Sequence, residues 1–107
     1  MTVMAGKLRH RVELHYPVKV VNDFGEEEWG YALMARVWAR VSPLSGSERL
    51  EAMELEAKVD HEVEIRYREG VTAQSRVVFG DRVFGVQAVI NPDHRDRQLL
   101  LMCEEVA

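Results

Sequence analysis

The chain has 107 residues, enough for one domain (residues 1–107) with one core, and its single cysteine, Cys103, fits synthesis in a reducing cytoplasm. Hydrophobic residues make up 47% and charged residues 30%, the balance of a soluble globular protein, with no apolar run long enough to span a membrane and no secretion signal. Fourteen Lys and Arg against eighteen Asp and Glu give a net charge of −4, which disfavours tight binding to the phosphates of DNA.

Hydrophobic and polar residues alternate with period two over most of the chain, which indicates half-buried β-strands. The first strand ends at Pro17, and Gly80-Asp81 forms a tight hairpin turn. The pattern predicts strands at residues 8–16, 33–41, 59–68, 76–79, 82–90 and 98–105. Both faces of the last strand carry hydrophobic residues, so both are expected to be at least partly covered. Together these segments predict an all-β fold, a small six-stranded antiparallel barrel or sandwich.

Residues 17–30 are predicted to form a long loop, which is uncommon in so small a domain unless it has a function. The loop contains Asn22-Asp23-Phe24-Gly25 and then three glutamates before Trp29. Trp29 is either exposed until a partner covers it or packed beneath its own loop.

The connection between the second and third strands differs from the rest. Ser45 and Glu48 have the spacing of a capping box, and residues 48–58 are good helix formers. Leu50 and Met53 share one face of this helix. About eleven residues make a marginal helix that depends on something to pack against.

No residue pattern points to an enzyme, a cofactor or a metal site. The four histidines lack metal-ligand spacing: His10 and His61 are expected to face the core, and His15 and His94 to be solvated. Cys103 lies among leucines and is expected to be a buried, inert thiol. Four glutamates on the predicted helix are more typical of a solvated face than of acid–base catalysis: Glu48, Glu51, Glu54 and Glu56.

Several blocks resemble the phage head-tail joining, or head-closure, family of siphophages and their prophages. They are AGKLRHRV at residues 5–12, VWARVSPLSGSE at 37–48, HEVEIRYREGVT at 61–72, RVVF at 76–79, RVF at 82–84 and RDRQLLLMCEE at 95–105. The blocks occur in order over nearly the whole chain. One departure from the family pattern is Gly85, which suggests a local bulge in its strand.

The resemblance implies a structural virion protein that assembles as a dodecameric ring beneath the portal and its adaptor. It would close the DNA-filled head and present the surface to which the tail binds. The connection at residues 43–58 would reach the channel, where its carboxylates repel phosphates and let DNA pass without specific binding. Ring neighbours would then pack against Leu50 and Met53. The isolated protein is expected to be monomeric, because no long apolar stripe remains once the core is filled.

Two other functions fit the same pattern. One is another connector component, such as a tail-completion protein, because these proteins share the barrel architecture. The other is a small β-barrel interaction module unrelated to virions. Neighbouring portal, capsid and adaptor genes would favour the connector.

Overall fold

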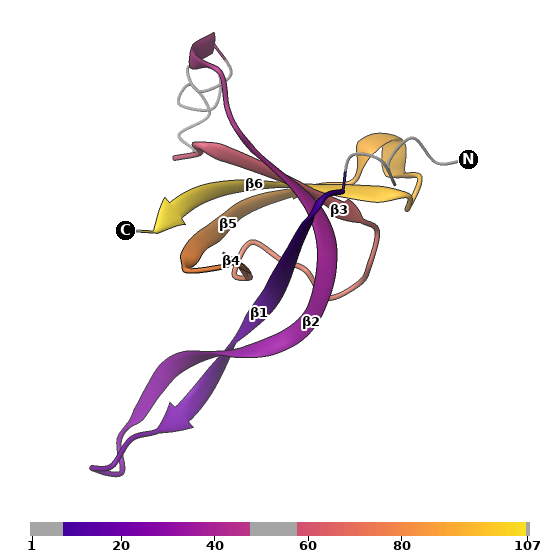
Figure 1. Cartoon of the computed structure of the whole chain (residues 1–107). Coiled ribbons are helices and arrows are strands. Elements are labelled where there is room, and N and C mark those ends of the chain that lie inside the picture. The colour runs from indigo at the N-terminus through magenta and orange to yellow at the C-terminus, as the bar shows by residue number, and fades with distance from the viewer. Residues whose placement is uncertain (1–7, 48–57, 107) are drawn as a thin grey trace.

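A computed structural model describes residues 8–47 and 58–106, which form a closed antiparallel β-barrel (Figure 1). Its strands are β1 (His10–Val21), β2 (Glu27–Pro43), β3 (His61–Arg66), β4 (Arg76–Phe79), β5 (Arg82–Ile90) and β6 (Gln98–Val106), with a short 3-10 helix η1 (Pro92–His94) before β6. The strand order is β1-β2-β3-β6-β5-β4, and β4 pairs back with β1 to close the barrel. The predicted six-stranded all-β fold is confirmed.

The core consists of alternate residues from the strands, as the period-two pattern predicts. Its buried members are Val12, Leu14, Ala39, Val63, Ile65, Val77, Phe84, Val86, Leu99, Leu101 and Cys103. On the opposite face of β6, Leu100 and Met102 are half-buried, so both faces of this strand are partly covered as expected. Glu64 also lies on the outward face but is buried, where the Arg40 guanidinium donates a hydrogen bond to its carboxylate at 3.1 Å.

The prediction of a long loop at residues 17–30 is wrong. β1 continues through Pro17 to Val21, β2 already begins at Glu27, and the two strands pair along this whole stretch. Pro17 is tolerated because β1 pairs with β4 only from Glu13 to His15, which leaves one edge of β1 open beyond that point. Figure 1 shows the resulting two-stranded arm, which projects from the barrel.

The turn at the end of the arm explains why the sequence there resembles a loop. The Asn22 side-chain oxygen accepts hydrogen bonds from the backbone N–H groups of Phe24 at 2.9 Å and Glu26 at 3.0 Å. Gly25 has a φ of +79°, a conformation that favours glycine. The turn signals are therefore genuine, but they belong to a tight hairpin turn rather than to a long loop.

Other boundaries differ less. β3 is shorter than predicted, at His61–Arg66, whereas β4 and β5 have the predicted bounds and Gly80 in the turn between them has a φ of +63°. The irregularity suspected at Gly85 lies slightly further along, between Val86 and Ala88.

Of the helix predicted at residues 48–58, only Lys58 is among the described residues. In the described part of the chain, no helix is long and apolar enough to cross a membrane.

Candidate functional site

The arm formed by the outer parts of β1 and β2 exposes an unusual number of large hydrophobic side chains. They are Tyr16, Val20, Val21, Phe24, Trp29, Tyr31 and Leu33, with Phe24 86% and Trp29 67% exposed. This overturns the expectation that no apolar stripe remains once the core is filled. Four of these side chains, Val20, Val21, Phe24 and Trp29, fall in the segment predicted as a loop, where alternation carries no information about which face is exposed. Trp29, Tyr31 and Leu33 share one face of the arm, whereas Tyr16 and Val20 lie on the other. Exposed aromatic side chains of this kind are typical of interaction surfaces.

Trp29 lies on a strand and not beneath a loop, so of the two alternatives the exposed one is correct. It pairs with Lys19 across the arm, and the Lys19 ammonium lies 5.4 Å from the centre of the tryptophan ring. Tyr31 lies two residues further along β2, and the Arg76 guanidinium of β4 is 4.1 Å from the centre of its ring. Trp29, Tyr31 and Arg76 all line a groove of about 410 Å³ at the base of the arm.

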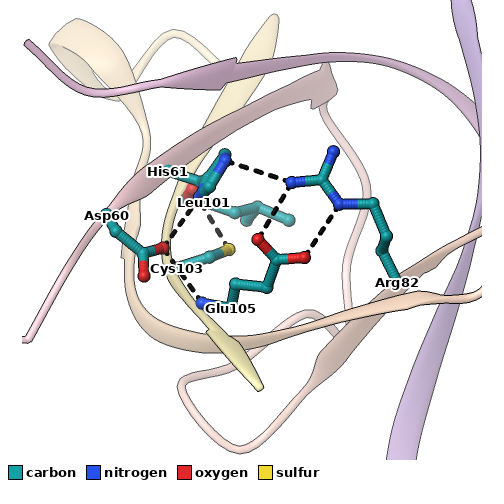
Figure 2. Close-up of polar contacts among 6 residues, drawn as sticks. All are labelled: Asp60, His61, Arg82, Leu101, Cys103 and Glu105. Atoms are coloured by element: carbon teal, nitrogen blue, oxygen red, sulfur yellow. Dashed lines mark hydrogen bonds and ion pairs between the residues drawn. The ribbon is translucent and has the colours of Figure 1, made fainter. Parts of the chain in front are cut away.

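A polar cluster lies at the end of the barrel where β3 begins and β6 ends (Figure 2). The Arg82 guanidinium donates two hydrogen bonds to the Glu105 carboxylate, of 2.8 and 2.9 Å. His61 lies between Arg82, at 3.4 Å, and the Asp60 carboxylate, at 2.8 Å. The Asp60 carboxylate also accepts the backbone N–H of Glu105 at 2.9 Å. These contacts tie β3, β5 and β6 together across the barrel end.

The hydrogen bonds fix the roles of the two His61 nitrogens. Because a guanidinium can only donate, the His61 Nε2 that faces Arg82 must accept, and Nδ1 then carries the proton donated to Asp60. The ring also meets Phe84 edge-on, with centroids 4.9 Å apart. His61 therefore faces the core and is hydrogen-bonded, as predicted. His10 likewise faces inward, its ring 4.7 Å from that of Phe79.

The charges in the cluster shift the pKa of several groups. The hydrogen bonds from Arg82 lower the pKa of Glu105 below its ordinary 4.5, and Glu105 in turn raises the pKa of Arg82. Cys103 is fully buried, and burial together with the charge of Asp60 raises the pKa of its thiol to about 12. Cys103 is therefore the buried, weakly nucleophilic thiol that the sequence predicts.

This cluster links the strands at one end of the barrel. Its guanidinium and carboxylate groups are engaged with one another, and no nucleophile in it reaches solvent. Within the described residues, no three His, Cys, Asp or Glu side chains gather closely enough to hold a metal ion. Of these residues, only His61 and Cys103 are predicted from the sequence to be buried. Arg82 and Glu105 become partners through strand register, which the sequence alone does not give.

The predicted channel residues and two of the predicted interface residues lie outside the described part of the chain: Glu48, Glu51, Glu54, Glu56, Leu50 and Met53. The structure does describe where their segment is attached. Pro43 pairs with His61, and the backbone N–H of Leu44 donates to the Asp60 carbonyl at 3.0 Å. The segment thus departs from the barrel end at which the polar cluster lies. Because β2 runs from the arm to Pro43, this end lies opposite the tip of the arm (Figure 1).

Comparison with known proteins gives one family and a shared fold. The profile of a family described as the phage head completion protein matches residues 3–106. The solution structure of protein SF1141 from Shigella flexneri 2a is similar, with a TM-score of 0.78 and 24% identity over 100% of this chain and 98% of that one. A chain in the virion of a native gene transfer agent particle is similar as well, with a TM-score of 0.61 and 21% identity over 92% of this chain and 96% of that one. A search of curated proteins gave no match.

Proposed function

The chain belongs to the phage head completion protein family, and we propose that it closes the DNA-filled head of a tailed phage or prophage and provides the surface to which the tail attaches. The family match carries this proposal, because residues 3–106 include all the strands of the barrel and the arm. A structural role agrees with the projecting arm, which exposes large hydrophobic side chains. The protein would be made in the cytoplasm of the bacterial host and reside in the virion.

The proposed arrangement is a ring, dodecameric as the family resemblance implies, beneath the portal and its adaptor. The arm supports assembly with other subunits, because Phe24 and Trp29 present exposed apolar surface. Portal, adaptor and tail proteins are the proposed partners, and contact with them would cover such side chains. Isolated protein at low concentration would remain monomeric.

We propose that residues 43–58 face the channel of the ring. Glu48, Glu51, Glu54 and Glu56 would line the lumen and repel the phosphates of passing DNA, while Leu50 and Met53 would contact neighbouring subunits. The attachment of this segment at the barrel end opposite the arm tip supports a division of roles, in which one end of β2 makes contacts and the other serves the channel.

The experiment is a gene deletion in the phage or prophage that encodes the chain, followed by separation of heads, tails and complete particles. We expect tailless heads that lose their DNA, together with free tails of normal length, and rescue by the gene supplied in trans. Complete particles from the deletion strain would contradict any role in the connector. Free tails of abnormal length or lacking an end structure would instead identify a tail-completion protein.

A further inference from the structure

Beside the barrel, arginine and aromatic side chains line a groove of about 600 Å³. Its polar and aromatic lining consists of Arg11, Arg36, Arg66, Arg68, Trp38 and Tyr67. They come from the start of β1, the middle of β2 and the chain at the end of β3. In the sequence only Arg66 and Arg68 are close together, and the pairing of the strands brings Arg11 and Arg36 beside them.

Much of the positive charge in this groove is not neutralised. Arg66 and Arg68 form no ion pair with any described residue, and Nε of Arg68 is buried without a hydrogen-bond partner. Arg36 pairs with Glu13 at 3.1 Å, and the Arg11 guanidinium lies 5.3 Å from the centre of the Trp38 ring.

The carboxylates at the margin of the groove act on its tyrosine. Asp96, burial and Glu69 together raise the pKa of Tyr67. These two carboxylates offset part of the positive charge near Tyr67, but the four arginines of the lining still make the groove a local basic site in a chain with a net charge of −4. Such a site suits a carboxylate-rich ligand with an aromatic side chain.

The tip of the arm has the complementary chemistry. Asp23, Glu26, Glu27 and Glu28 are all exposed there, beside the exposed rings of Phe24 and Trp29. Among the described residues only Lys19 forms an ion pair with these carboxylates, at 3.5 Å from Glu27. The tip is thus an acidic, aromatic projection held in shape by the Asn22 turn.

The tip cannot reach the groove of its own chain. Glu27 and Trp38 lie on the same continuous strand, β2, eleven residues apart, which corresponds to about 35 Å along the strand. Only the groove of another copy is accessible to it. A contact between two different surfaces of identical chains is heterologous, and it generates a ring when the rotation closes.

We propose that the arm tip of one copy docks into the arginine groove of the next, with carboxylates of the tip paired to Arg66 and Arg68 and its aromatic rings beside Trp38. This inference rests on the proposed ring and names the contact between its subunits. A single such contact is small, so dilute protein stays monomeric, and a shared scaffold favours the ring by raising the effective concentration.

The experiment is sedimentation velocity over a concentration series up to about 1 mM, the effective concentration that a shared scaffold supplies. Wild-type protein associates at low salt and dissociates at high salt. The groove variant R66E/R68E and the tip variant E26K/E28K each lose association roughly tenfold or more. R95E/R97E is the matched control for R66E/R68E, because Arg95 and Arg97 are exposed but do not line the groove, and this variant associates like the wild type. Circular dichroism confirms that each variant is folded.

Mixing the groove variant with the tip variant tests the heterologous geometry. The groove variant keeps its wild-type tip and the tip variant keeps its wild-type groove, so the mixture should associate although neither variant does so alone. Wild-type protein that stays monomeric, or variants that associate unchanged, would overturn the proposal. So would a groove variant that loses DNA binding in a gel shift while still self-associating, because nucleic acid would then be the occupant. If the contact fails while the gene deletion still releases tailless heads, head closure stands and only this interface is wrong.

Discussion

Arg82 and Glu105 face each other across the end of the barrel through two hydrogen bonds, of 2.8 and 2.9 Å. The pair links β5 to β6, and the Arg82 guanidinium lies 5.1 Å from the centre of the buried Phe84 ring, at the end from which residues 43–58 depart. This relationship makes the cluster a fixed base for the proposed channel segment.

Replacing Arg82 with alanine should lower the midpoint of thermal unfolding, because the Glu105 carboxylate loses both hydrogen bonds from the guanidinium and His61 loses one of its two contacts. Arg82→Lys should recover part of the loss, since it restores the charge but not the two-pronged geometry. Differential scanning calorimetry measures both variants. Equal stability of the alanine variant and the wild type would show that the pair contributes nothing.

Stability should fall in acid. The pKa of Glu105 is lowered by Arg82, and that of Glu13 is lowered first by its hydrogen bond to His15 and then by Arg36. A carboxyl whose folded pKa lies below its unfolded value stabilises the fold at higher pH, and the contribution disappears as pH falls through the folded pKa. The loss should therefore occur below about pH 4.5, the ordinary value of both groups. Urea unfolding at a series of pH values tests this, and Arg82→Ala should flatten the profile.

Truncating a core side chain should reduce stability, whereas truncating a side chain of the arm should reduce assembly. Phe84 is fully buried, so Phe84→Ala should cost about 3–5 kcal/mol of unfolding free energy. Trp29→Ala should change stability by no more than about 0.5 kcal/mol, because the side chain is largely solvated, yet it should impair incorporation into particles. Denaturant titrations and particle counts separate the two effects. A Trp29 variant that is unstable, or one that assembles normally, would contradict an interface role.

Much of this arrangement was predictable from the sequence, and the failures have physical causes. The alternation of hydrophobic and polar residues predicts which face of each strand lies in the core, and Val63 and Leu101 are examples. It does so because a strand with one buried face needs a hydrophobic residue at every second position. The arm was misread because Pro17 ends most strands, and its tolerance here depends on an open edge that only the register reveals. The Arg82–Glu105 pair is 23 residues apart in sequence and exists only once β5 and β6 are aligned.

Cys103 should react with thiol reagents only when the barrel opens. With a pKa of about 12, about one thiol in ten thousand is ionised at pH 8, and the side chain is fully buried besides. Labelling by a maleimide should be slow in native buffer and rapid in denaturant, so that its rate reports opening. Fast labelling of the folded protein would place the thiol at the surface.

Deleting residues 48–57 and joining the ends through a short glycine linker should leave the barrel folded, since Pro43 and His61 remain paired. Heads that carry the variant should leak DNA or fail to bind tails. Circular dichroism checks the fold, and nuclease sensitivity of the packaged DNA checks the head. If the heads retain DNA and bind tails, the segment only connects β2 to β3 and the proposed channel role is wrong.

Averaged electron micrographs of the neck, from particles with and without this protein, test the proposed head closure most directly. We expect a ring of density between the portal and the tail that disappears, together with the tail, when the protein is absent. An unchanged ring, or a difference located on the capsid or at the far end of the tail, would contradict the proposed role.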